Sequence, residues 1–263
     1  METDPIRPIL AAQHDEGYWV YPGPGYGPKY TGTVWQLTFL DQLGADPSHP
    51  QVRLACEYVL TDSQTSFGGF GAMGGFRAKQ PPPSSAIHCL NGNLLDALLG
   101  FGWIDHGRVQ HSIDSQARSI TGEGFDHYFK SGTNGPGFGC AANEGLPCAW
   151  GAIKAMLALA RVPEERREPH VQRAIAAGVE FLLSRDPAIA NYPMGWGNTK
   201  PRGSWLKLGF PSGYLSDALQ NPGALYEPGF GDVPRLQPAI GWLLGKQNPN
   251  GQWVNQYSYH GKT

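Results

Sequence analysis

The sequence predicts an all-α protein built from repeated helix pairs. Four segments carry a glycine four residues into a helix-like apolar run, and these glycines recur at spacings of 60, 59 and 62 residues: Gly32, Gly92, Gly151 and Gly213. A second, amphipathic run follows each of them, and the period-two alternation that is typical of strands is nearly absent. A period of this length indicates a repeat protein in which neighbouring units share one core.

The first run of each predicted pair is apolar nearly all round. These runs are KYTGTVWQLTFL, CLNGNLLDALLG, CAWGAIKAMLAL and FPSGYLSDALQ, at 29–40, 89–100, 148–159 and 210–220. The second runs carry charged and amide side chains on one side and lie at 49–60, 106–117, 168–183 and 233–244, with a fragment of an earlier outer helix at 6–12. Because a helix that is apolar on all faces is buried, we expect a ring or superhelix with the first helices inside.

Composition limits the class of protein. With 263 residues, of which 40% are hydrophobic, the chain can form one substantial core, and we expect a single domain over 1–263 with repeats at about 20–70, 71–130, 131–200 and 201–263. A net charge of −2 without a basic run excludes a nucleic-acid partner. No export signal or membrane-spanning run is present, so the expected location is cytoplasmic, where four cysteines are free thiols or metal ligands.

A short motif lies between helix pairs: Gln, three residues, Gly, one residue, then an aromatic residue. Its three copies are Gln13, Gly17 and Trp19; Gln64, Gly68 and Phe70; and Gln247, Gly251 and Trp253. The glycine permits a tight turn, the glutamine can bind backbone groups at a helix end, and the aromatic ring can pack over the neighbouring pair. We interpret the motif as structural.

This motif resembles the QW repeat of squalene and oxidosqualene cyclases. The helix pair of about 60 residues is similar to the repeat of the α/α toroid that these cyclases share with protein prenyltransferase β-subunits. The resemblance implies an α/α toroid of the terpenoid cyclase and prenyltransferase superfamily, with a central apolar cavity for an isoprenoid-type substrate. The sequence has neither the DxDD acid motif of the cyclases nor a DDxxD cluster, which argues against ordinary triterpene cyclisation.

Cys89 and Cys148 occupy the same position in consecutive repeats, three residues before an aligned glycine. His88 is adjacent, and Cys140 lies in a loop that can fold back over the same rim. Thiolates and an imidazole suit zinc with one open position. The resemblance also implies zinc, which prenyltransferases bind through Asp, Cys and His, although Leu146 stands where their Asp would lie. The alternative is that these cysteines pack as small apolar residues and that the histidine is merely hydrogen-bonded.

Two acids and three rings complete the candidate site. Asp96 and Asp217 each follow an aligned glycine by four residues, in the position that Gln36 occupies in the first repeat. A carboxyl group facing the cavity with a raised pKa could act as a general acid, or it could cap or bridge a neighbouring helix. Trp35, Trp150 and Tyr214 could stabilise a carbocation through their ring faces, or they could be core.

The repeat count predicts an incomplete ring. Closed toroids of this type usually have five or more pairs, and here four are followed by a full copy of the motif. We expect a truncated domain, one end of a longer protein, or a ring closed by association of homo-oligomers. Three functions stay open: a cyclase- or prenyltransferase-like enzyme, a non-catalytic toroid that binds a lipid or a protein partner, and an inactive fragment.

Overall fold

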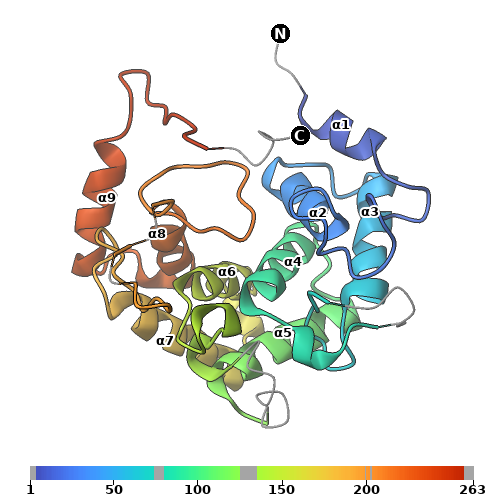
Figure 1. Ribbon diagram of the computed structural model, residues 1–263, viewed down its shortest axis with the longest axis horizontal. Coiled ribbons are helices and arrows are strands. Elements are labelled where there is room, and N and C mark those ends of the chain that lie inside the picture. Colours follow the sequence, from blue (N-terminus) through green and yellow to red (C-terminus); the bar gives the residue numbers. More distant parts are fainter. Residues whose placement is uncertain (1–3, 74–79, 125–134, 199, 202, 258–263) are drawn as a thin grey trace.

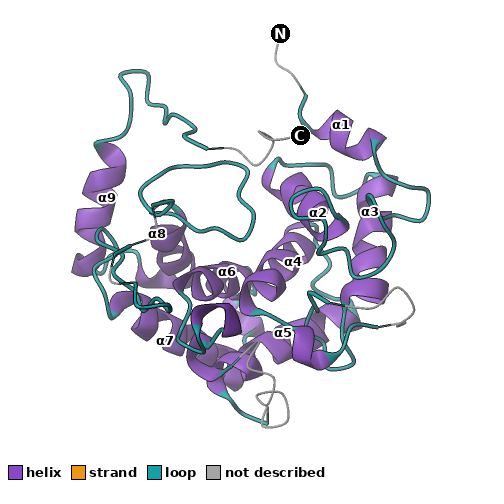
Figure 2. Cartoon of the chain, in the orientation of Figure 1, coloured by secondary structure: helices purple, strands orange, loops and turns teal. Residues whose placement is uncertain are grey.

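The computed structural model describes residues 4–73, 80–124, 135–198, 200–201 and 203–257. Helices are the regular structure of this part of the chain, which otherwise forms isolated β-bridges and no strand (Figure 2). The predicted all-α class is confirmed. None of the described helices combines the length and the apolarity needed to cross a bilayer.

The helices form an inner and an outer row. The inner row is α2 (Thr33–Gln42), α4 (His88–Gly100), α6 (Ala149–Ala160) and α8 (Gln220–Leu225), and the outer row is α1 (Ile6–Ala11), α3 (Pro50–Tyr58), α5 (Gly107–Thr121), α7 (Pro169–Leu183) and α9 (Gln237–Leu244). Figure 1 shows the inner helices following one another along an arc with the outer ones around it. Within each row, α4 packs on α2 and α6, and α5 packs on α7. The toroid and the repeat bounds stay predictions.

The inner helices pack closely because small residues stand at their contacts. A Cβ added to Gly92 of α4 would lie 2.3 Å from the carbonyl carbon of Lys154 in α6, so only glycine allows this approach. The outer helices α3 and α5 begin at histidine caps. His49 accepts a hydrogen bond from the backbone N–H of Gln51, and His106 accepts one from Arg108.

The three motif copies form turns that we name the first turn (13–19), the second turn (64–70) and the third turn (247–253). In each, the glutamine side-chain amide donates to the carbonyl of the motif glycine, which has a left-handed φ between 76° and 96°. The first and second turns also bind the start of the next outer helix, through the carbonyls of Gln51 and Arg108. The motif thus connects neighbouring outer helices.

The fourth inner helix differs from its prediction. Residues 210–219 are not helical, and α8 begins only at Gln220. Pro211 lacks a backbone donor and Gly213 is a poor helix former, while the Asp217 carboxylate binds the backbone N–H groups of Leu219 and Gln220 at the helix start. Tyr214 and Asp217 therefore lie on a non-helical segment rather than on an inner helix.

This segment, residues 209–220, is bound by polar side chains of the inner row. Gln42 of α2 exchanges two hydrogen bonds with the backbone of Ser212, at 2.9 and 2.6 Å. Asn93 of α4 donates to the carbonyl of Gly213 at 3.3 Å. These contacts hold the segment against α2 and α4.

Candidate ligand pocket

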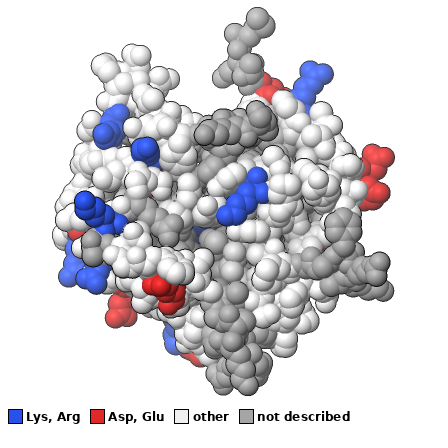
Figure 3. Space-filling model, viewed as in Figure 1, with Lys and Arg blue, Asp and Glu red and all other residues white. Residues whose placement is uncertain are grey.

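A pocket of about 400 Å³ opens beside the N-terminal ends of α4 and α6. We call it the thiol pocket, and its lining residues are Tyr26, Lys29, Ile87, His88, Cys89, Cys140, Ala141, Ala142, Asn143, Cys148, Trp150, Gly151 and Tyr214. They come from the Gly- and Pro-rich segment before α2, the starts of two inner helices, the loop 140–148 and the segment 209–220. On the face shown in Figure 3, most of the surface is uncharged and its charged side chains lie in small scattered groups.

The three thiols predicted as metal ligands lie together in this pocket. Cys140 and Cys148 are linked by a side-chain hydrogen bond, which together with burial raises the pKa of Cys148 well above its usual value. Burial and the neighbouring Cys140 raise the pKa of Cys89 to about 12. At neutral pH the Cys89 and Cys148 thiols are therefore protonated, and they contribute neutral, polarisable surface.

His88 lines the pocket but its ring nitrogens are both engaged. Nε2 lies 2.9 Å from the carbonyl oxygen of Gly135, and Nδ1 lies 3.2 Å from the side-chain amide of Gln116. Burial lowers the pKa of His88 to about 4, so the ring is neutral. This arrangement leaves the imidazole no free nitrogen for a metal ion.

The described residues do not fit a four-ligand zinc site. Within this part of the chain, no group of three or more His, Cys, Asp or Glu side chains has the arrangement of a metal site. With His88 engaged, only the three thiols could contribute protein ligands in the pocket. Zinc binding stays a prediction.

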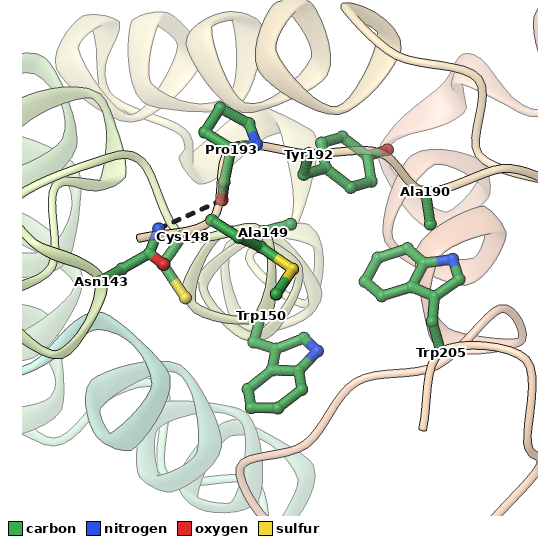
Figure 4. Close-up of a pocket in the computed structure, with 9 residues that line it drawn as sticks. Asn143, Cys148, Ala149, Trp150, Ala190, Tyr192, Pro193 and Trp205 are labelled. Carbon is green, nitrogen blue, oxygen red and sulfur yellow. Dashed lines mark hydrogen bonds between the residues drawn. The ribbon is translucent and has the colours of Figure 1, made fainter. Parts of the chain in front are cut away.

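The loop that carries two of the thiols is ordered by Asn143. Its side-chain amide donates to the carbonyls of Pro147 and Pro193, and its oxygen accepts from the backbone N–H of Gly195. Figure 4 shows the hydrogen bond between Asn143 and Pro193 beside a small pocket that Cys148 and Trp150 also line. Asn143, Cys148 and Trp150 thus line both this pocket and the thiol pocket.

The predicted cavity aromatics divide into two groups. Trp150 and Tyr214 line the thiol pocket, with ring centroids 5.8 Å apart. Trp35 is 1% exposed and lies behind Tyr214, with its indole N–H bound to the carbonyl of Tyr26 at 2.7 Å. The ammonium of Lys29 is 4.6 Å from the centroid of the Tyr214 ring. Trp35 therefore supports the wall, and Trp150 and Tyr214 form it.

Asp96 and Asp217 are not among the described residues that line the thiol pocket. Asp96 forms an ion pair with Arg161, which also binds Asp41 of α2 at 3.2 Å. Burial raises the pKa of Asp41 to about 7, against the lowering effect of Arg161. Arg161 directly follows α6, so this pairing connects the end of α6 with α2 and α4. It corresponds to the bridging alternative for Asp96.

Asp217 is buried and accepts three backbone hydrogen bonds, from Gly209, Leu219 and Gln220. Burial raises the pKa of this carboxyl group, and the backbone donors oppose the rise. Its contacts are those of a capping group. The structure therefore gives neither aspartate an orientation into the thiol pocket, and their role as acids stays a prediction.

A second cavity, which we call the lysine pocket, lies beside the segment 209–220 and has a volume of about 230 Å³. Lys154 of α6 lines it, is 3% exposed, and donates to Ser212 Oγ at 3.2 Å and Gln220 Oε1 at 2.5 Å. Burial lowers the pKa of this amine to about 8, and the carboxylates of Asp217 and Asp96 partly oppose that effect.

Lys154, Tyr26 and Lys29 were not predicted from the sequence as lining residues. A lysine inside the otherwise apolar run AIKAMLALA is a signal that could have found the first. Tyr26 and Lys29 lie in YPGPGYGPKY, where Gly and Pro hide any periodicity, so their position in the wall follows only from the fold.

No protein-family model and no curated protein sequence matches the chain. Similar solved structures include a protein from Actinoplanes, at 16% identity and a TM-score of 0.33, with 95% of this chain and 82% of that one covered. They also include the type II terpene cyclase MstE from Scytonema without ligand, at 15% identity and a TM-score of 0.36, with 95% and 80% covered. A variant of that cyclase in complex with geranylgeranyl dihydroxybenzoate (substrate) has 15% identity and a TM-score of 0.34, with 95% and 79% covered. The likeness is loose and concerns the fold alone.

Proposed function

We propose that the chain binds an apolar, isoprenoid-type ligand in the thiol pocket. The observation that supports this most is the lining, in which neutral thiols and the rings of Trp150 and Tyr214 surround about 400 Å³. Pockets for small molecules usually enclose about 300–1,000 Å³ and combine apolar walls with a few polar groups. Here the polar side chains of the lining include those of Lys29, His88 and Asn143.

The proposal concerns binding and assigns no reaction. An acid-initiated cyclisation needs a carboxyl group within reach of the ligand, and the described lining contains no Asp or Glu. The cation–π contact between Lys29 and Tyr214 favours a ligand with a polar head, because the ligand's hydroxyl or carboxylate could bind the ammonium while its hydrocarbon part contacts the rings. We therefore favour an isoprenoid alcohol or acid over a pure hydrocarbon.

The test is a titration of the full chain with farnesol and geranylgeraniol, followed by tryptophan fluorescence because Trp150 lines the pocket. Ala142 also lines it, and Ala142→Trp is expected to fill the pocket and weaken binding by at least tenfold, which is about 1.4 kcal/mol. Ala176→Trp is the matched control, since Ala176 is exposed on the outer helix α7.

The expected result is saturable binding that Ala142→Trp weakens and Ala176→Trp leaves unchanged. Two results contradict the proposal: no saturable signal up to the solubility limit of either alcohol, or equal affinities for the two variants. Circular dichroism of both variants shows whether the fold is retained.

A further inference from the structure

The three motif turns have the same internal bonds but different surroundings. Besides the glutamine bond, each motif glycine N–H donates to the carbonyl three residues earlier, in Gly17, Gly68 and Gly251. The indole N–H groups of Trp19 and Trp253 each donate to the carbonyl ten residues earlier, at 2.8 and 2.7 Å. The third turn is therefore folded in the same way as the first.

The first and second turns bind an outer helix in one fixed register. The glutamine amide donates to the carbonyl of the second helical residue, Gln51 in α3 at 3.0 Å and Arg108 in α5 at 2.8 Å. The motif glycine lies against the fifth helical residue, so an added Cβ would come within 2.9 Å of the Leu54 carbonyl oxygen and 2.4 Å of that of His111. Two independent copies thus define what this turn binds: the first two turns of an α-helix.

The third turn has no such helix among the residues that the structure describes. A Cβ added to Gly251 would meet only the turn's own Gln247 amide, at 3.6 Å. Trp253 is 44% exposed, whereas Trp19 is 2% exposed in the first turn. Leu244 and Val254 beside it are 59% and 67% exposed. A preformed turn with exposed apolar neighbours is a typical docking surface.

The third turn is a motif turn without a bound helix, and at the other end of the outer row α1 is a helix whose start has no bound motif turn among the described residues. Helix α1 leads into the first turn, as α9 leads into the third. By the register of α3 and α5, its second residue, Arg7, is the one whose carbonyl a motif glutamine would bind. Arg7 is exposed.

We propose that the third turn of one chain binds α1 of a second copy, so that copies associate head to tail. The interface would repeat the contact that the first and second turns already make within the chain. The Gln247 amide of one copy would donate to the Arg7 carbonyl of the other, and Trp253 would be covered by the second copy. Such a contact joins two different surfaces, so it produces an open row or a ring of copies. This inference goes beyond ligand binding and does not depend on it.

Sedimentation velocity of the full chain over a range of concentrations gives the first measurement. We expect association that Gln247→Ala weakens about fivefold, as loss of one hydrogen bond predicts. Gln252→Ala is the matched control, because Gln252 lies exposed in the same turn and its backbone alone bonds to Asn248. A chain that stays monomeric at all concentrations, or equal effects of the two variants, overturns the proposal.

Cross-linking then identifies the partner surface. A chain carrying Gln247→Cys is mixed with one carrying Arg7→Cys and treated with a short bis-maleimide, and the unaltered chain gives the background of its four native cysteines. A covalent dimer specific to the mixture is expected. If a chain that carries both substitutions instead cross-links within itself, or if the mixture gives only background, the partner is not α1 of a second copy.

Discussion

Lys154 shows how a single residue can combine a structural contact with an unusual proton affinity. Its amine connects α6 to Ser212 and Gln220, and burial lowers its pKa from 10.5 to about 8. In the unfolded chain the amine keeps its proton up to about pH 10.5, so between pH 8 and 10.5 the unfolded state binds more protons than the folded one. The contribution of Lys154 to the free energy of unfolding therefore rises with pH between pH 8 and 10.5.

The quantity to compare is the free energy of unfolding of the natural chain minus that of Lys154→Met. We expect this difference to increase by up to about 1.4 kcal/mol per pH unit between pH 8 and 10. Urea denaturation at several pH values measures the difference, and the comparison cancels groups common to both chains. Lys246→Met, at an exposed lysine, is the control and should keep the natural pH dependence. Parallel curves for the natural chain and Lys154→Met would show that the buried amine does not titrate in this range.

Residue roles were predictable where the repeat itself determines them. Cys89 and Cys148 share one position in consecutive repeats, and both line the thiol pocket. Asp96 was equally visible, but its partner Arg161 lies 65 residues away, directly after α6, and no periodicity encodes a pairing between helices. His88 has both ring nitrogens bound by groups 47 and 28 residues away, so its engagement could not be derived from its neighbours in sequence.

At the scale of elements, the contact between α4 and α6 depends on a glycine. A methyl group at Gly92 would overlap the backbone of Lys154 and Ala155, at 2.3–2.6 Å, and backbone cannot move aside as a flexible side chain can. We expect Gly92→Ala to destabilise the protein by about 1–3 kcal/mol through overpacking. Thermal unfolding followed by circular dichroism measures this loss.

Gly241→Ala is the matched helical control. Gly241 lies in α9, and a Cβ there would meet no atom within 4 Å. Because alanine has the higher helix propensity, this variant should be unchanged or more stable by about 0.5–1 kcal/mol. Equal losses of stability in the two variants would mean that the close approach of α4 and α6 is not what Gly92 permits.

Helices were predictable where periodicity and caps agree. The runs at 49–60 and 168–183 appear as α3 and α7, which both begin at a proline in the first helical position. The run FPSGYLSDALQ aligns with the other inner helices by its glycine, yet Pro211 and Gly213 weaken its helix propensity and Gln42 and Asn93 bind its backbone. A repeat alignment cannot reveal that tertiary contacts replace a helix.

At the scale of the whole molecule, the segment 209–220 connects the inner row. Gln42→Ala removes both of its hydrogen bonds to Ser212, and we expect a loss of about 1 kcal/mol for each. Hydrogen exchange measured by mass spectrometry should be faster throughout 209–220 and unchanged in α5.

Gln172→Ala provides the control for that measurement, because Gln172 is exposed and makes one side-chain bond, to Arg167 on the outer row. It should leave exchange in 209–220 as it is. Unaltered protection of this segment in Gln42→Ala would indicate that other contacts, such as that of Lys154 with Gln220, are enough to retain it.

The late position of the segment 209–220 in the sequence also affects the order in which contacts can form during synthesis. Its partners Gln42, Asn93 and Lys154 precede their contacts by 170, 120 and 66 residues. During synthesis α2, α4 and α6 therefore emerge and pair while the wall that Tyr214 completes is still missing. Until residues 209–220 have been synthesised, the rings of Trp35 and Trp150 lack the contacts that Tyr214 makes with both of them in the folded chain.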